Sequence, residues 1–290
     1  VLGTTACGKS GLGVELAKRF DGEIVSADSR QVYKGLDLGT GKVTEEEMEG
    51  VPHHMLDVVE PNQPYSVADF QAGAYAAIDD ILARGRTPFL VGGTGLYVRA
   101  VTEGFTFTDA RPDPALRAEL EGKTTEELYA LLREKTGVTL TGGEENNRHR
   151  LMRSVEKALS GRWESPPPCP RYDCLLLGVT FPREEVCRRI DARLQARIDA
   201  GMLDEVAELR ANGATDAFLE GLGLEYRYIL RYLTGQIPTL DGLKDELGRA
   251  IKRFAKRQMV WFKKDRDVLW LDMEGDFLTQ AVRAVEGFLA

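Results

Sequence analysis

The chain has 290 residues, a mass of 32.2 kDa and a hydrophobic content of 43%, so we expect one large domain with an insertion, or two domains, with an ample core. A net charge of −8 excludes a uniformly basic nucleic-acid binder but is compatible with a local basic groove. No run approaches the roughly 18 apolar residues of a membrane-spanning helix, so we expect no membrane partner.

The chain opens on VLGTTACGKS, which fits the pattern G-x-x-x-x-G-K-[S/T] of a P-loop. The glycines let the backbone curl so that several N–H groups point at one anion, while Lys9 adds a cation and Ser10 a hydroxyl that can reach Mg²⁺. Leu12, Leu16 and Phe20 follow with helical spacing, and a helix N-terminus also favours an anion. The pattern predicts a polyphosphate site without specifying ATP. Its residues are Gly3, Thr4, Thr5, Ala6, Cys7, Gly8, Lys9 and Ser10.

The segment EIVSAD (23–28) is typical of a buried strand, and Asp28 stands at its end. In an open parallel sheet this end lies at the carboxyl edge, beside the phosphate site. A carboxylate there can hold Mg²⁺ through water or take a proton from a substrate nucleophile. The alternative is that Asp28 and Ser29 only cap a turn. Gln31, Tyr33 and Lys34 follow in a polar loop.

A helix is predicted over 66–85, because Ser66 and Asp69 form a capping pair and Gly85 ends the segment. The next segment, TPFLVGGTG (87–95), is a strand that runs into a glycine turn. Kinases and ATPases usually carry an acidic residue near the end of such a strand to order Mg²⁺ and water. Here glycines and Thr94 stand there instead, which argues against nucleoside triphosphate hydrolysis.

Between about 112 and 170 the strand signal disappears. Helices are predicted over 124–137 and 146–161, followed by the proline-rich linker WESPPPCPRYD. Strands return at 174–181 and 268–272, before a terminal helix. The pattern predicts an α/β fold: a P-loop NTPase-like, doubly wound parallel sheet with a helical insertion domain. We expect core residues 1–111, an insertion at 112–171 and the rest of the core at 172–290.

The segment 248–272 concentrates basic residues with Phe254, Trp261 and Phe262 between them, which suits a phosphate backbone and base stacking. The alternative is a solvated face, or pairing with carboxylates such as Glu246 and Asp265. The basic residues of this predicted helical stretch are Arg249, Lys252, Arg253, Lys256, Arg257, Lys263, Lys264 and Arg266. A second basic cluster on the insertion comprises Arg148, His149, Arg150 and Arg153.

The cysteines show no C-x-x-C pairing and no histidine partners at zinc spacing, so reduced intracellular thiols are expected. They are Cys7, Cys169, Cys174 and Cys187. Only Val1 and Leu2 precede the P-loop, and we expect the natural N-terminus to lie upstream.

Seven motifs in this order resemble one family along almost the whole chain: tRNA dimethylallyltransferase, the isopentenyltransferase that modifies adenosine 37 beside the anticodon. The motifs are GTTACGKS, SADSRQVYKGLDLGTGK, VGGTGLY, NNRHRLMRSVE, RRIDARLQARIDAGMLDEV, LGLEYRYI and AKRQMVWFKKD. Cys7 stands where the family usually has serine, and LGLEYRY replaces the commoner Gly-Tyr-Arg segment. A eukaryotic-type C-terminal zinc finger does not appear, which favours the bacterial type.

The resemblance implies that the P-loop binds the diphosphate of dimethylallyl diphosphate rather than ATP. The adenine N6 would attack C1 of the prenyl chain and release diphosphate, with Mg²⁺ at Ser10 assisting. It implies Asp28 as the base, Thr94 near the reacting centre and Arg193 on the diphosphate. The target base must leave its stack to react. A cytoplasmic monomer is expected.

By the same resemblance, the anticodon stem-loop of the tRNA would contact three parts of the chain. These residues are Asp28, Ser29, Arg30, Gln31, Thr94, Arg117, His149, Arg150, Leu151, Met152, Arg153, Lys256 and Arg257.

Three other functions remain open from the sequence. A small-molecule P-loop kinase shares the loop, but the missing acidic strand end disfavours it. An adenylate isopentenyltransferase would use the same chemistry without gripping an anticodon. A non-enzymatic P-loop RNA-binding module would not need Asp28 and Arg193 to converge on the loop.

Overall fold

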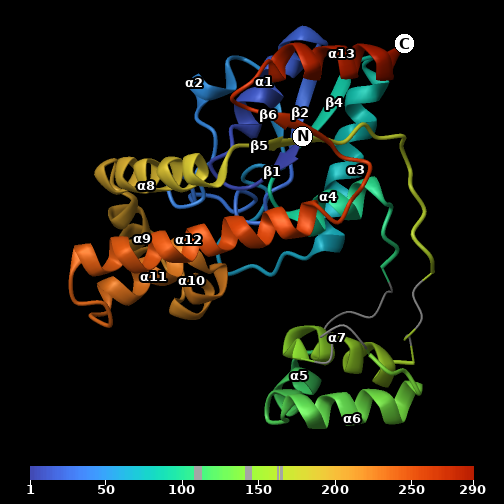
Figure 1. Cartoon of the computed structure of the whole chain (residues 1–290). Coiled ribbons are helices and arrows are strands. Elements are labelled where there is room, and N and C mark those ends of the chain that lie inside the picture. The colour runs from blue at the N-terminus through green and yellow to red at the C-terminus, as the bar shows by residue number, and fades with distance from the viewer. Residues whose placement is uncertain (108–112, 141–145, 162, 164–165) are drawn as a thin grey trace. The chain divides into compact units, whose positions relative to one another are not determined.

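The computed structural model describes residues 1–107, 113–140, 146–161, 163 and 166–290 (Figure 1). The chain forms two compact units, one of Val1–Glu103 with Pro170–Ala290 and one of Gly104–Cys169. We call the first the core and the second the insertion. The division falls before the boundary expected at 112, which lies outside the described residues, and just before the one expected at 171.

The core contains two three-stranded sheets in which every pair of strands is parallel, in the orders β3-β2-β4 and β1-β5-β6. A parallel bridge between Leu2 and Gly92 joins β1 to the end of β4. The predicted parallel α/β core is therefore confirmed. The strands are β1 (Leu2–Gly3), β2 (Gly22–Ser26), β3 (His53–His54), β4 (Thr87–Val91), β5 (Leu177–Thr180) and β6 (Leu269–Asp272).

Helices pack on both faces of these sheets because successive strand residues point to opposite sides. Ile24 packs with α1 and α13, whereas Val25 packs with α3 and α4. The predicted Ser66–Asp69 capping box is present at the start of α3. These helices are α1 (Lys9–Arg19), α3 (Val67–Ala83), α4 (Gly95–Thr102) and α13 (Phe277–Leu289), with a short α2 (Glu45–Met48) before β3.

A second hydrophobic cluster in the core is helical, and it packs against the loop that follows β2 through Val32 and Leu36. In Figure 1 the yellow-to-orange helices of this cluster lie together beside the strands. They are α8 (Arg183–Asp199), α9 (Met202–Ala211), α10 (Asp216–Leu222), α11 (Leu224–Leu233) and α12 (Leu240–Phe262).

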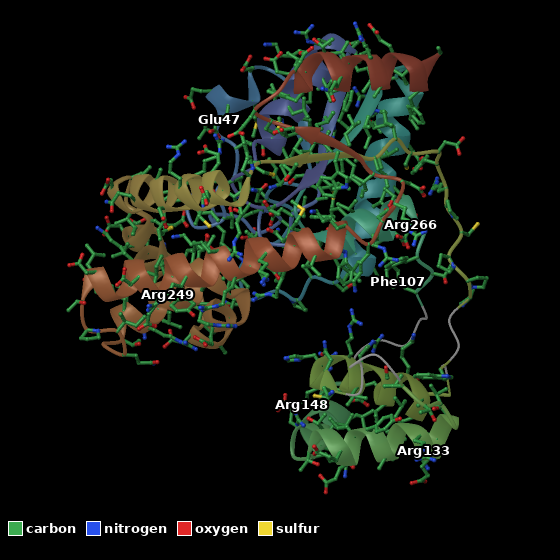
Figure 2. The ribbon with its side chains drawn as sticks, in the orientation of Figure 1. Glu47, Phe107, Arg133, Arg148, Arg249 and Arg266 are labelled. Atoms are coloured by element: carbon green, nitrogen blue, oxygen red, sulfur yellow. The ribbon has the colours of Figure 1, made fainter. Side chains whose placement is uncertain are left out.

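The basic stretch predicted as one helix is in fact divided. Helix α12 ends at Phe262, so Lys263, Lys264 and Arg266 lie beyond it, before β6. Figure 2 shows Arg249 on α12 and Arg266 in the segment that follows the helix. The strand β6 hydrogen bonds to β5, and this pairing requires the chain to leave the helix before Leu269.

The insertion consists of α5 (Pro114–Glu121), α6 (Thr125–Thr136) and α7 (Arg148–Leu159). The helices predicted at 124–137 and 146–161 both form, and Thr124 and Glu127 make a capping box on α6. Leu120, Leu128 and Leu151 belong to a small core of its own. Within the described ranges, every helix of the protein is too short or too polar to cross a bilayer.

Candidate active site

The P-loop connects β1 to α1 through backbone that only small residues can adopt. Gly8 has φ 83° immediately before α1, and Ala6 has φ 61°. A Cβ on Gly3 would lie 2.9 Å from the carbonyl oxygen of Val179, so glycine is required there. Cys7, the departure from the family serine, is fully buried and its Sγ lies 2.7 Å from the Thr4 carbonyl oxygen. The loop is thus closely packed on β5.

A cavity of about 530 Å³ opens beside this loop. It lies where β2 and β4 end and where α8, α11 and α12 approach. In open parallel sheets this carboxyl edge is the usual ligand site. The cavity brings together ten of the residues predicted for the site from distant parts of the sequence. They are Thr5, Lys9, Ser10, Asp28, Ser29, Arg30, Gln31, Thr94, Arg193 and Arg257.

The ends of β2 and β4 are joined at Asp28 and Thr94. One carboxylate oxygen of Asp28 accepts from the amide of Arg30 at 2.9 Å, and Thr94 Oγ1 accepts from the amide of Ser29 at 3.0 Å. The Thr94 amide in turn donates to the carbonyl of Ala27 at 3.2 Å. Asp28 therefore does cap a turn, as the alternative supposed, yet it also lines the cavity, so the two roles are compatible.

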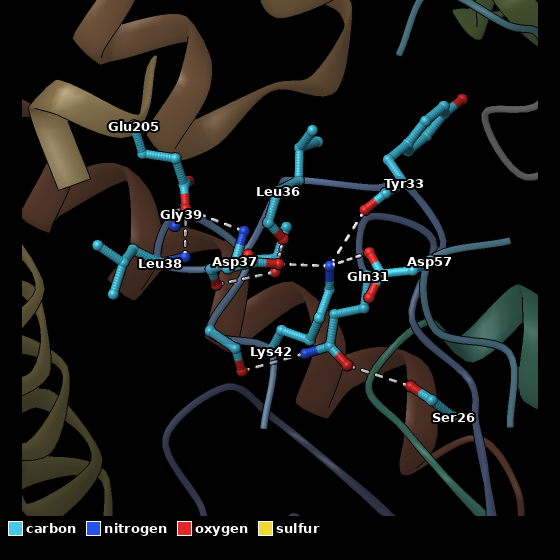
Figure 3. Close-up of polar contacts among 12 residues, drawn as sticks. Ser26, Gln31, Tyr33, Leu36, Asp37, Leu38, Gly39, Lys42, Asp57 and Glu205 are labelled. Atoms are coloured by element: carbon cyan, nitrogen blue, oxygen red, sulfur yellow. Dashed lines mark hydrogen bonds and ion pairs between the residues drawn. The ribbon is translucent and has the colours of Figure 1, made fainter. Parts of the chain in front are cut away.

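Glu205 on α9 holds the loop 36–42 (Figure 3). Its carboxylate accepts from three successive amides, those of Asp37 at 3.0 Å, Leu38 at 2.6 Å and Gly39 at 3.0 Å. The hydroxyl of Tyr226 on α11 donates to the same carboxylate at 2.9 Å. Successive backbone N–H groups that converge on one anion form a nest, so this loop is preorganised by a side chain far away in sequence.

Lys42 closes the other side of that loop. Its Nζ donates to the carbonyl of Tyr33 at 3.2 Å and pairs with Asp37 and Asp57, each at 2.5 Å (Figure 3). The Lys42 side chain is only 7% exposed, so these bonds replace most of its hydration.

The held loop presents the carbonyl of Gly41 to two predicted site residues. Gln31 Nε2 donates to it at 3.1 Å and Arg193 Nη2 at 3.4 Å. Gln31 is itself anchored to β2, because its Oε1 accepts from Ser26 Oγ at 3.1 Å. Gly41 has φ 61°, and a Cβ there would lie 2.1 Å from Arg193 Nη2 and 1.4 Å from Arg197 Nη2. Only glycine permits this approach.

Arg193 and Arg197 lie one helical turn apart on α8, facing Glu225 at the start of α11. Arg197 Nη1 is 3.7 Å from Glu225 Oε1. Burial lowers the pKa of both arginines, that of Arg197 to about 10, and raises the pKa of Glu225. Among the described residues, Arg197 Nη2 and Trp261 Nε1 are the buried side-chain polar atoms without a hydrogen-bond partner. The cluster is an electropositive, poorly hydrated wall of the cavity.

Helix α12 is tied to both ends of the phosphate site by Gln258. Its Oε1 accepts from the amide of Thr5 at 2.9 Å, and its Nε2 donates to the carbonyl of Gly93 at 2.8 Å. Trp261 packs so closely on the start of α4 that a Cβ on Gly95 would lie 2.4 Å from its ring. The sequence analysis named Trp261 only as a stacking aromatic, and it did not identify Gln258. The signal for Gln258 in the sequence is that it is a single amide among basic residues.

Three more residues were missed as individuals. Arg197, Glu205 and Glu225 all stand inside motifs that carry the resemblance. The i, i+4 spacing of Arg193 and Arg197 within RIDARLQAR was a usable signal, since it places both on one helix face. No local pattern pairs Glu205 with residues 37–39.

The predicted tRNA-binding residues outside the cavity fall into different environments. Lys256 is exposed on α12, and His149 and Arg150 are exposed on α7. Leu151 is 0% exposed in the core of the insertion, and Met152 packs partly against that core. The Leu151 side chain therefore stabilises the insertion and has no surface to offer a partner.

Arg117 and Arg153 share one carboxylate within the insertion. The side chain of Glu156 is only 2% exposed and pairs with Arg117 and, at 2.9 Å, with Arg153 Nη1. Arg148 donates to the carbonyls of Leu120, Lys123 and Glu121 at the end of α5. These guanidinium groups hold α5 and α7 together.

A magnesium ion would need oxygen atoms from a ligand here. No group of three or more His, Cys, Asp or Glu in the described part of the chain is arranged to hold a metal. Mg²⁺ commonly takes one or two protein oxygens and completes its octahedron with phosphate and water. Ser10 and Asp28 both line the cavity and are donors of this kind, so the residues fit Mg²⁺ together with a diphosphate.

Comparison with known proteins gives a consistent result over the whole chain. The family model described as IPP transferase matches residues 31–265, and the one described as isopentenyl transferase matches residues 1–60. The tRNA dimethylallyltransferase of Oceanobacillus iheyensis is 38% identical over 306 residues, covering 100% of this chain and 95% of that relative. That of Symbiobacterium thermophilum is 42% identical, covering 95% of this chain and 89% of the relative.

Solved structures agree with the sequence relatives. The tRNA isopentenylpyrophosphate transferase of Bacillus halodurans superposes with a TM-score of 0.74 at 37% identity, over 99% of this chain and 93% of that one. A eukaryotic dimethylallyltransferase described as acting on tRNA superposes with a TM-score of 0.80 at 25% identity, over 99% of this chain and 77% of that one.

Proposed function

The chain belongs to the tRNA dimethylallyltransferase family of prenyltransferases, and from this premise we propose the reaction that its cavity performs. The dimethylallyl group of dimethylallyl diphosphate is transferred to N6 of adenosine 37 in the anticodon stem-loop of a tRNA, and diphosphate is released. One observation carries this proposal: the P-loop, Asp28 and Arg193 line a single cavity of about 530 Å³. That volume is in the range of sites for small ligands.

The leaving group is held by the basic side of the cavity. Lys9 and Arg193 line it beside the P-loop amides, and negative charge on the departing diphosphate is stabilised by such preorganised donors. Ser10 would hold Mg²⁺ together with the diphosphate, and the ion would supply further positive charge to the leaving group. As the N6–C1 bond forms, the C1–O bond breaks and its electron pair leaves on the diphosphate.

Asp28 is the proposed base for the N6 proton. Adenine N6 is a poor nucleophile, so removal of its proton as the new bond forms helps the reaction. The hydrogen bond to the Arg30 amide orients the carboxylate, and Thr94 fixes the neighbouring Ser29 amide. Asp28 and Thr94 both line the cavity at the edge where β2 and β4 end.

We propose that the P-loop NTPase-like core uses its phosphate loop to bind the leaving group. The strand β4 is followed by Gly92, Gly93 and Thr94, without a carboxylate to order an attacking water. ATP is therefore neither consumed nor required.

We infer that the tRNA backbone is bound by exposed polar and basic side chains on α12 and α7, with the target base flipped into the cavity. Lys256, Arg257, His149 and Arg150 are exposed, and Arg257 lines the cavity beside Phe254. Arg117 and Arg153 remain proposed tRNA contacts. Both also form ion pairs with Glu156. An RNA substrate and four free cysteines fit the cytoplasm. A monomer is proposed, and sedimentation velocity tests it.

One assay tests the function against its alternatives. Purified protein is mixed with labelled dimethylallyl diphosphate, Mg²⁺ and tRNA, AMP or ATP. Label is expected in tRNA only, at the base beside the anticodon. Label in AMP or ATP would instead indicate an adenylate isopentenyltransferase. Hydrolysis of ATP that is stimulated by tRNA would support the alternative of a P-loop kinase.

A further inference from the structure

The loop 36–42 is held by side chains of two helices as well as by its own backbone hydrogen bonds. Besides the three amides bound by Glu205, the Gly41 amide donates to the Leu38 carbonyl at 3.1 Å and the Lys42 amide to the Asp37 carbonyl at 3.0 Å. Polar loops on a surface ordinarily hydrogen bond to water. Here helices α9 and α11 both supply side chains to the loop, through Glu205 and Tyr226.

These hydrogen bonds fix the position of the Gly41 carbonyl. It accepts from Arg193 Nη2 at 3.4 Å and from Gln31 Nε2 at 3.1 Å. A guanidinium has five N–H donors in a rigid fork, so one hydrogen bond to a fixed acceptor orients the others. Arg193 lines the same cavity as Lys9 and Ser10, so its remaining donors are available to a ligand that binds there.

Arg193 has a competing partner within the same cluster. Glu225 is half-buried and pairs with Arg197 at 3.7 Å, and its negative charge also attracts Arg193. A guanidinium drawn onto Glu225 would present fewer donors to an incoming anion. The Gly41 carbonyl opposes that movement, because Glu205 binds the same loop at residues 37–39 and the Gly41 amide donates to the Leu38 carbonyl.

We propose that Glu205 is a positioning residue for the diphosphate site: through the loop 36–42 and the Gly41 carbonyl it orients Arg193 toward the leaving group. This inference rests on the proposed function and adds to it a residue outside the cavity lining. Glu205 does not touch the substrate, and its carboxylate acts only through the backbone that it binds.

The test measures the binding of inorganic diphosphate with Mg²⁺ by calorimetry, without tRNA. Glu205→Gln replaces one acceptor oxygen by an NH₂ group that faces backbone N–H donors, so the nest loses its charge and part of its geometry. We expect diphosphate affinity to fall about tenfold, the scale of one hydrogen bond to a charged group, and the KM for dimethylallyl diphosphate to rise in parallel. Glu208→Gln, an exposed glutamate on the same helix, is the matched control and should bind normally.

Tyr226→Phe is a milder second variant, because it removes only the fourth hydrogen bond of Glu205 and keeps a buried ring. It should weaken diphosphate binding in the same direction by about two- to threefold, a fraction of the contribution of one hydrogen bond, because the three amides still hold Glu205. If both variants bind diphosphate within about twofold of Glu208→Gln, Glu205 only stabilises the fold and the inference is wrong. Normal binding by both variants would not affect the proposed function, provided that the wild-type protein prenylates tRNA. If the wild-type protein does not prenylate tRNA, the proposed function itself is wrong.

Discussion

Arginine side chains have opposite roles in the cavity of the core and beside the small hydrophobic cluster of the insertion. Six Lys and Arg side chains line the cavity, against the two carboxylates of Asp28 and Glu225. In the insertion, Arg117 and Arg153 instead share the buried Glu156, and Arg148 is bound to backbone carbonyls. Both regions look basic in sequence, yet only the first has a large excess of cations around an open space.

The difference shows that the surroundings of an arginine, an open cavity with excess cations or a buried carboxylate, decide what it does. Where Arg193 and Arg197 crowd together, burial lowers the pKa of each, so an incoming diphosphate supplies charge that the protein lacks. Where Glu156 is 2% exposed, the arginines around it satisfy a buried carboxylate that would otherwise be costly. The first arrangement favours a ligand, and the second stabilises a fold.

The strongest test of the cavity is Asp28→Asn. The substitution keeps the size of the side chain and the turn that it caps, but it removes the proposed base. Turnover should fall by about 10² or more, the usual contribution of a general base, while diphosphate and tRNA affinities stay close to wild type. Single-turnover kinetics measure this, and a rate within a few-fold of wild type means that Asp28 is not the base.

Lys9→Ala tests the excess of positive charge directly. Losing a charge-assisted donor should weaken dimethylallyl diphosphate binding by about 2 kcal/mol, or roughly thirtyfold. Calorimetry with the diphosphate measures the change. Lys18→Ala, an exposed lysine on the same helix, is the control. Equal affinities in the two variants would show that the P-loop does not hold this ligand.

Glu156→Gln tests the opposite arrangement in the insertion. It leaves Arg117 and Arg153 without their buried counter-charge, so the insertion should lose about 1–2 kcal/mol of stability. Hydrogen exchange along α5 and α7 reports the loss, and Glu119→Gln on the exposed face of α5 is the control. If protection is unchanged, the pairing with Glu156 does not stabilise the insertion.

The smallest effect is expected for the exposed cations of α12. Reversing the charge of Lys256 and Arg257 should raise the KM for tRNA several-fold and lower the slope of log affinity against log salt by up to ~1 for each lost phosphate contact. Dimethylallyl diphosphate affinity should fall by less than in Lys9→Ala, since Lys9 and Arg193 hold that ligand and Arg257 is the one residue of this pair that lines the cavity. An unchanged salt slope would place the tRNA elsewhere on the protein.

Much of the fold and part of the site followed from local patterns. The alternation of strands and helices predicted the parallel core, the Ser66–Asp69 pair predicted the start of α3, and the P-loop predicted an anion site. Asp28 and Thr94 could be placed together because the carboxyl ends of neighbouring parallel strands meet at one edge. The end of α12 at Phe262 was not anticipated, because strand pairing of β6 overrides helical spacing.

The sequence by itself determined the phosphate loop and the strands and helices with the clearest local signals, such as β2, α3 and α6, because periodicity and turn chemistry act over a few residues. Only the tertiary structure decided which charges face one another. Glu205 binds amides at 37–39, Gln258 binds the amide of Thr5, and Glu225 faces Arg197. Each pair joins elements far apart in the chain, and their electrostatics depend on distance and burial, which no local spacing encodes.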